Sequence, residues 1–464
     1  MNIAIVSTFF LVMLIVGILS MKKIKDPASY YVADRKGNTA AITGSLLATT
    51  IGGSSTIGLA GLGYSKGLVG AWWLLVGVVG LFILSFWLAE KVRNYKVYTL
   101  PEILEKQYGG NTIKIAASLL ISVAWLGIIS AQIIAAGKIL SVLWPGQTTL
   151  LMIIAASVFI VYTVLGGQYS ILRTDFIQSL IIITGIIICL AAGVHSAGGL
   201  TVMAGRLPES CFSFPVSVSF SWIDLFTFLF FVGATYLVGP DIYSRILCSK
   251  NSRIAKRSIM MAAVALIPVA FFITLIGMTA RVILPGIPPE NAFPSLIIRV
   301  LPAGLSGLVI AALLAAVMSS ADTCLLTTST IVSADIIDPL FRSKMGGISL
   351  LIISRICVVA IGIVSLFIAL KVKGIIVSLL LGYTVYSSGL IIPIILGFYK
   401  NRLKLNAFGA ILAVIGGGGL GLYLKLSGYN DLLLLALPIS ALLLIAGSRV
   451  GNAISCKKAE LNGV

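Results

Sequence analysis

A stretch rich in hydroxyl groups lies inside an apolar run and carries the clearest chemistry in this sequence. If residues 311–330 are helical, one face presents five small or hydroxyl-bearing side chains, those of Ala316, Ser319, Ser320, Thr323 and Thr327. Neighbouring hydroxyls and carbonyls supply the oxygen ligands that a small, hard cation prefers. Such hydroxyls also bond back to carbonyls of their own helix. The carboxylate of Asp322, beside this face, favours a functional site because charges inside apolar spans are costly.

Two further apolar runs contain residues that interrupt a helix. In the first, Gly52 and Gly53 lie at the midpoint and are followed by three hydroxyl residues. Each glycine destabilises a helix by about 1 kcal/mol relative to alanine, and an opened helix exposes carbonyls to a cation or substrate. In the second, Pro240 follows Gly239 and removes one backbone donor. Interruptions at corresponding places in two halves indicate a transport site; the alternatives are close packing of small residues and a simple proline kink.

The elements that position these groups follow from composition. The chain has 464 residues, of which 59% are hydrophobic and 10% charged, with a mean hydropathy of +1.10. A soluble domain is about 45–50% apolar and about 25% charged, so an ordinary cytoplasmic enzyme, a disordered protein and a nucleic-acid binder are excluded. A run of roughly 20 apolar residues spans a membrane as a helix. Thirteen segments qualify: 3–21, 40–64, 71–90, 115–141, 148–165, 175–195, 221–245, 258–280, 304–331, 350–370, 375–399, 405–424 and 432–448.

Basic residues orient these spans. With the N-terminus outside and the C-terminus cytoplasmic, 25 of the 33 lysines and arginines lie on the inner side and 8 on the outer side. The inner count includes the region 245–257, which begins with Arg245. Because positively charged loops face the cytoplasm, we expect a multi-pass protein of the plasma or inner membrane, in contact with lipid and without nucleic-acid partners. An odd number of spans agrees with this orientation.

The chain offers little for catalysis. Its single histidine, His195, lies near the outer end of a span, and no nucleophile–base arrangement or GxxxxGK[ST] run occurs in the sequence. We therefore expect neither enzymatic activity nor ATP-driven pumping. Asp175 opens the sixth span at its inner end, where it either pairs with Arg173 or caps the helix N-terminus.

Four motifs, at 30–35, 48–64, 166–178 and 318–326, resemble the sodium/solute symporter family, which includes sodium-coupled sugar, proline and sialic acid carriers. The resemblance implies an all-α integral membrane protein with a five-plus-five inverted-repeat (LeuT-type) core that contains discontinuous helices. It implies one transporter domain, 1–464, with these parts: a peripheral first helix and inner loop at 1–39, the two five-helix repeats at 40–195 and 221–399, and two peripheral helices with a cytoplasmic tail at 400–464.

The resemblance also implies site residues. The main sodium site falls on Ala48, Ile51, Ala316, Ser319 and Ser320. A second site, used by some members, falls on Asp175, Ser319, Asp322 and Thr323. Because Asp322 replaces a hydroxyl residue of those members, this second site takes either a cation or a proton. Substrate contacts fall on Gly52, Ser55, Thr56, Trp73, Gln132 and Tyr236. Trp73 is alternatively part of an interfacial aromatic belt.

The expected function is sodium-coupled secondary active symport, the import of a small organic solute by alternating access. Sodium is the co-transported ion, and a monomer is sufficient for transport. The predicted pocket is small and rich in hydroxyls, with Leu74 where sugar carriers offer a carboxylate, which favours an amino acid or small carboxylate over a hexose. The alternatives are a proton-coupled symporter of the same fold, a channel, and a sensor built on a transporter fold.

Overall fold

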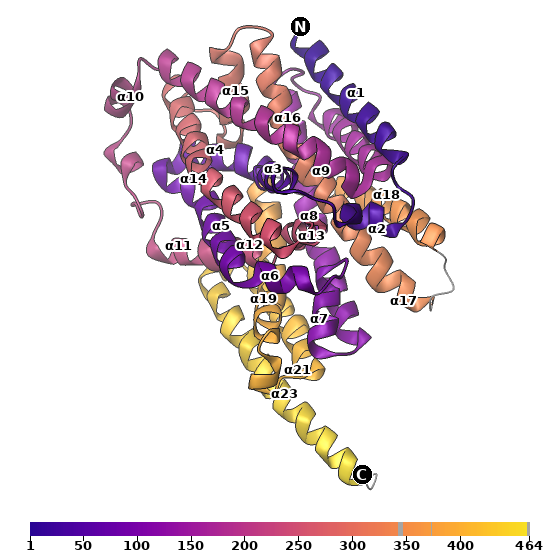
Figure 1. The fold of residues 1–464 in the computed structure, drawn as a ribbon. Coiled ribbons are helices and arrows are strands. Elements are labelled where there is room, and N and C mark those ends of the chain that lie inside the picture. The colour runs from indigo at the N-terminus through magenta and orange to yellow at the C-terminus, as the bar shows by residue number, and fades with distance from the viewer. Residues whose placement is uncertain (342–346, 373, 462–464) are drawn as a thin grey trace.

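The computed structural model describes residues 1–341, 347–372 and 374–461, which form helices joined by short connections (Figure 1). The first half comprises α1 (Asn2–Met21), α2 (Pro27–Val32), α3 (Thr39–Thr50), α4 (Leu59–Lys66), α5 (Trp72–Ile83), α6 (Ala89–Asn94), α7 (Leu100–Tyr108), α8 (Asn111–Ser141), α9 (Thr148–Ser196) and α10 (Leu200–Arg206). The second half comprises α11 (Trp222–Phe228), α12 (Ala234–Val238), α13 (Pro240–Cys248), α14 (Ser252–Ile283), α15 (Ala292–Val300), α16 (Leu305–Thr330), α17 (Asp338–Leu340), α18 (Gly347–Lys371), α19 (Ile375–Gly397), α20 (Lys400–Leu403), α21 (Ala407–Leu412), α22 (Gly418–Leu426) and α23 (Ala436–Leu461).

Each of the thirteen predicted spans coincides with helix. In the described part of the chain, 11 helical stretches are long and apolar enough to cross a membrane. Two of these stretches, Ser54–Asn94 and Thr148–Ser196, each run through parts of two predicted spans. The second is divided only at Gly167, whose backbone is non-helical (φ 51°). The connection expected at 166–174 is therefore helical on both sides of one glycine. Of the lysines and arginines counted for orientation, Arg342, Lys344 and Lys373 lie outside the described residues.

The helix α16 forms the centre of the bundle and α1 lies at its edge (Figure 1). In the stretch Leu305–Leu340, 94% of the most apolar window is buried, compared with 22% in α1. Helix α16 packs against α9, α8, α3 and α18. A helix covered on all sides belongs to the core, whereas one with a single covered face borders another medium, here lipid. The hydroxyl groups of α16 are therefore held deep inside the protein.

The helix that contains Gly52 and Gly53 is interrupted, as predicted. Helix α3 ends at Thr50, and Ile51 departs from helical backbone angles (φ −88°, ψ 52°). A wide helical turn, Ser54–Gly58, then leads into α4. The break leaves carbonyl groups at the end of α3 without their usual helical partners.

The second predicted interruption separates α12 from α13. Gly239 is extended (φ −63°, ψ 130°), and Pro240 begins the next helix, where its missing N–H costs nothing. A Cβ atom at position 239 would lie 2.6 Å from the Thr235 carbonyl oxygen, so the backbone leaves room for glycine alone. The Val238 carbonyl, freed by the break, accepts a hydrogen bond from the Tyr386 hydroxyl of α19. A side chain of α19 thus supplies this carbonyl with the donor that the broken helix lacks.

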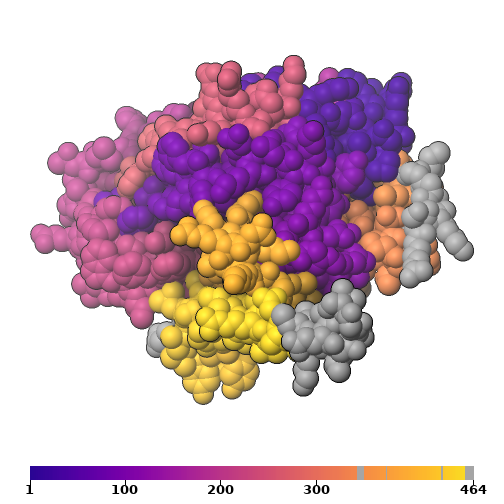
Figure 2. Space-filling model, turned by 60° about the horizontal axis from the view of Figure 1, so that its bottom comes forward, coloured from indigo at the N-terminus to yellow at the C-terminus, as the bar shows by residue number. Residues whose placement is uncertain are grey.

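The last helices form a separate group at one end of the molecule. Helices α21 and α23 pack against each other, and α22 packs against α19. In Figure 2 the orange and yellow C-terminal segments gather in one area of the face shown. The N-terminus and the C-terminus lie at opposite ends of the molecule (Figure 1).

Candidate functional site

The hydroxyl face of α16 meets the broken end of α3. Ser319 Oγ lies 2.8 Å from the carbonyl oxygen of Ala48 on α3 and 2.9 Å from that of Ala316 on its own helix. Ser320 Oγ lies 2.6 Å from the carbonyl oxygen of Thr49 and 3.3 Å from that of Ala316. All five residues are buried. Neutral oxygen atoms from two helices therefore converge at one buried point, which we call the neutral oxygen cluster.

Gly52 makes this close approach between the two helices possible. A Cβ atom at Gly52 would lie 2.3 Å from Ser320 Oγ, a distance that real side chains do not reach. The N–H of the next residue, Gly53, donates a hydrogen bond to Gln132 Oε1 of α8 at 2.8 Å. Ile51 lies in the break itself and is fully buried. The residues predicted for the main sodium site, Ala48, Ile51, Ala316, Ser319 and Ser320, thus lie at this one junction.

A charged cluster lies one helical turn further along α16. Arg245 of α13 forms an ion pair with Asp175 of α9, with Nη2 3.2 Å from Oδ2 and both side chains fully buried. The same Nη2 donates to Thr49 Oγ1 at 3.0 Å and also to Thr323 Oγ1. Arg245 Nε donates to Ser45 Oγ at 3.0 Å. One guanidinium thereby connects α13, α9, α3 and α16, and we call this group the Arg245 cluster.

Two expectations from the sequence are wrong here. Asp175 neither pairs with Arg173 nor caps a helix, because α9 continues through this position. Arg173 is exposed instead, with its guanidinium 5.2 Å from the centre of the Tyr169 ring. Arg245 was counted with the loop charges of 245–257 but is buried inside the bundle. Hydropathy alone does not distinguish a loop arginine from one that has a distant carboxylate as its partner.

Asp322 makes its hydrogen bond outside the Arg245 cluster. Its side chain accepts a hydrogen bond from Thr163 Oγ1 of α9 at 3.2 Å and is 2% exposed. No ion pair to Asp322 is present among the residues that the structure describes. Of the residues predicted for the second ion site, Asp175 and Thr323 are therefore joined through Arg245, while Asp322 is directed to a different neighbour.

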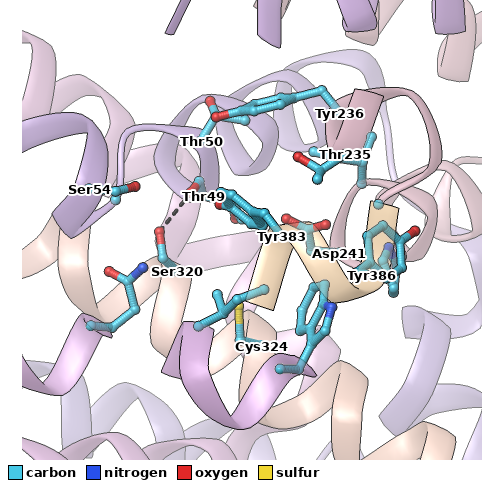
Figure 3. Close-up of a pocket in the computed structure, with 17 residues that line it drawn as sticks. Thr49, Thr50, Ser54, Thr235, Tyr236, Asp241, Ser320, Cys324, Tyr383 and Tyr386 are labelled. Carbon is cyan, nitrogen blue, oxygen red and sulfur yellow. Dashed lines mark hydrogen bonds between the residues drawn. The ribbon is translucent and has the colours of Figure 1, made fainter. Parts of the chain in front are cut away.

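A small cavity of about 40 Å³ adjoins both helix breaks (Figure 3). It has room for on the order of three water molecules. Of the six residues predicted to contact substrate, Gly52, Gln132 and Tyr236 line it. Ser55, Thr56 and Trp73 are almost fully buried and do not line it. Trp73 packs edge-on against Phe228, with ring centres 5.5 Å apart.

Several wall residues of the cavity were not predicted from the sequence. They include Trp125 of α8, Asp241 of α13, and Tyr383 and Tyr386 of α19. Asp241 carried a usable signal, because a carboxylate directly after a helix break inside an apolar span marks a functional position. The tyrosines gave no comparable signal, since aromatic residues in apolar runs are also ordinary packing groups.

Apolar helices that surround a polar cavity at two helix breaks define a membrane transporter. The family model described as "Sodium:solute symporter family" matches residues 30–417. The chain therefore belongs to the sodium:solute symporter family.

Curated relatives are similar over most of this chain. The sodium/myo-inositol cotransporter of Bos taurus is 26% identical, over 79% of this chain and 58% of its own length. Sodium/glucose cotransporter 2 of Rattus norvegicus is 26% identical, over 91% of this chain and 71% of its own length. The chain thus spans less than two thirds of the myo-inositol cotransporter.

Solved structures establish the fold. A substrate-bound, outward-open Na⁺-coupled sialic acid symporter is similar with a TM-score of 0.81 and 19% identity, over 97% of this chain and 98% of its own. The nucleobase-cation-symport-1 family transporter Mhp1, in a closed conformation, is similar with a TM-score of 0.63 and 15% identity, over 93% and 96%. The predicted all-α, LeuT-type fold with discontinuous helices is confirmed.

Proposed function

We propose that this protein imports a small organic solute together with sodium by alternating access. The observation that carries the proposal is the position of Ser319 Oγ, within hydrogen-bond distance of carbonyl oxygens from both α3 and α16. The ligands of sodium would be the oxygen atoms that now form these hydrogen bonds. They are the hydroxyl oxygens of Ser319 and Ser320 and the carbonyl oxygens that accept hydrogen bonds from them. Because these ligands come from two helices, sodium binding stabilises the arrangement that holds the helices together.

Sodium binding and solute binding would reinforce each other. Ser320 belongs to the neutral oxygen cluster and, together with the adjacent Gly52, also lines the cavity, so one helix junction serves both ligands. Coupling of this kind is reciprocal. Each sodium that moves inward down 100 mV supplies about 2.3 kcal/mol, which corresponds to nearly fifty-fold solute accumulation at roughly 1.4 kcal/mol per tenfold change.

The test is the double substitution Ser319→Ala and Ser320→Ala. Both hydroxyls contact α3 carbonyls, so their loss should raise the sodium concentration for half-maximal uptake by at least about tenfold. Uptake is measured with purified, correctly folded protein in liposomes. Ser157→Ala is the matched control, because that exposed hydroxyl bonds only the Ile153 carbonyl of its own helix. Unchanged sodium dependence in the double variant would contradict the proposal.

We propose that Asp322 carries a proton rather than a second sodium ion. Asp175 and Thr323 already bond Arg245, whereas Asp322 accepts a hydrogen bond from Thr163 and has no ion pair within the described part of the chain. A buried carboxylate without a counter-charge favours its neutral form. Asp322→Asn mimics that form and should remove the pH dependence of uptake while sodium dependence persists. A pH profile identical to that of the wild type would reduce Asp322 to a structural role.

The remaining expectations enter the proposal unchanged. We propose repeats at 40–195 and 221–399, an external N-terminus, a cytoplasmic C-terminus and a location in the plasma or inner membrane. The opposite placement of the two chain ends agrees with an odd number of crossings (Figure 1).

The relatives are named for glucose and myo-inositol, but the small cavity favours an amino acid or small carboxylate for this chain. A monomer is sufficient, because every proposed ligand comes from one chain.

A further inference from the structure

A carboxylate without an ion-pair partner among the described residues lines the cavity. Asp241 follows the break between α12 and α13, and Figure 3 shows its carboxylate beside the ring of Tyr383 and near Thr235. Its hydrogen-bond donors are the backbone N–H groups of Asp241 and Ile242 in the first turn of α13, and among the described residues no side chain is ion-paired with it. The nearest arginine along the helix, Arg245, is one turn away and is ion-paired with Asp175 instead.

The surroundings of Asp241 suit a positive charge. The rings of Tyr236, Tyr383 and Tyr386 line the same cavity, and aromatic faces attract cations. No lysine, arginine or histidine lines it. A solute that brought only a negative charge would meet the carboxylate without compensation, which is costly inside a protein.

An unsatisfied donor lines the cavity as well. The indole N–H of Trp125 on α8 has no hydrogen-bond partner, although the side chain is only 3% exposed. A buried donor without a partner costs free energy, and this one belongs to a wall residue of the cavity. A ligand oxygen would satisfy it. The cavity therefore offers one anionic group and one orphan donor.

We propose that the solute carries a protonated amine, which binds Asp241, and an acceptor oxygen, which binds the Trp125 N–H. This inference rests on the proposed symport function and narrows its solute class. A small zwitterion such as an amino acid meets both requirements. A plain carboxylate lacks the amine, and a neutral polyol leaves the Asp241 charge unpaired.

The experiment measures the thermal stability of the purified full-length protein with pairs of probes that differ in the amine. The pairs are L-alanine with L-lactate, and glycine with glycolate; myo-inositol and D-glucose are added separately. Each probe is tested in sodium chloride and, separately, in potassium chloride at the same concentration. A ligand that binds only the folded state raises its stability by mass action. The stability is also measured in sodium chloride without any solute. A rise relative to potassium chloride shows sodium binding, so this measurement tests the ion site of the proposed symport independently of the solute.

The expected result is sodium-dependent stabilisation by an amine-bearing probe and none by its hydroxyl partner. In Asp241→Asn the apparent affinity for that amine should fall at least about tenfold. Trp125→Phe should weaken it too, and this variant should fold normally because the N–H bonds no protein group. Stabilisation by lactate, glycolate, myo-inositol or glucose equal to that by the amines would overturn the inference, as would amine binding unchanged in both variants. Stabilisation by sodium alone would meanwhile uphold the ion site.

Discussion

The neutral oxygen cluster and the Arg245 cluster lie on consecutive turns of α16, but they satisfy buried polar atoms in different ways. The first joins hydroxyls of Ser319 and Ser320 to carbonyl oxygens of α3. The second pairs the carboxylate of Asp175 with a guanidinium that belongs to the protein. A neutral group of oxygens is able to accept a cation and release it. A carboxylate paired with a covalently attached cation is not, so the second cluster suits a permanent structural connection.

The largest effect should come from the charged side of this comparison. Arg245→Met leaves Asp175 buried without a counter-charge, which should destabilise the protein by about 3–5 kcal/mol. Thermal unfolding followed by size-exclusion fluorescence measures the change. The double variant Arg245→Met with Asp175→Asn removes both charges and should recover most of the lost stability. If the single variant unfolds at the wild-type temperature, the cluster is not the structural connection that we describe.

An intermediate effect should come from the neutral side. Gly52→Ala places a methyl group against Ser320 Oγ, and overpacking of this kind costs about 1–3 kcal/mol. Since the strain separates α3 from α16, the half-saturating sodium concentration for uptake should rise about tenfold. Gly419→Ala is the control, because its added methyl group would meet no atom within 4 Å. Wild-type sodium dependence in Gly52→Ala would show that the helices do not need this close approach.

The smallest effect distinguishes the two clusters directly. Thr323→Val removes one acceptor of Arg245, which should lower stability by about 1 kcal/mol. Sodium dependence, including its cooperativity, should stay the same because Arg245 already supplies the positive charge there. The control is Thr330→Val, whose hydroxyl bonds only the Leu326 carbonyl of its own helix. A loss of sodium cooperativity in Thr323→Val, but not in the control, would assign a second sodium ion to the cluster.

The sequence predicted the spans and the breaks because both follow from local rules. Apolar runs of sufficient length and the residues Gly52, Gly53, Gly239 and Pro240 are visible without tertiary information. The ion pair between Asp175 and Arg245 was not visible, because its members are 70 positions apart and each has an ordinary local explanation. The cavity walls were predicted only in part for the same reason, since helical phase and neighbour contacts determine which side chains of α19 reach it.

The burial of Arg245 has a consequence for how the chain is made. A guanidinium that enters the lipid alone costs at least about 2.5 kcal/mol, and a carboxylate in the same segment adds a similar amount. The segment from Trp222 to Cys248 carries both Asp241 and Arg245. Asp175 of α9 precedes this segment in the chain and is therefore synthesised first. Insertion of the later segment would therefore depend on the earlier helix being in place, so that biogenesis proceeds in an order set by a single charge pair.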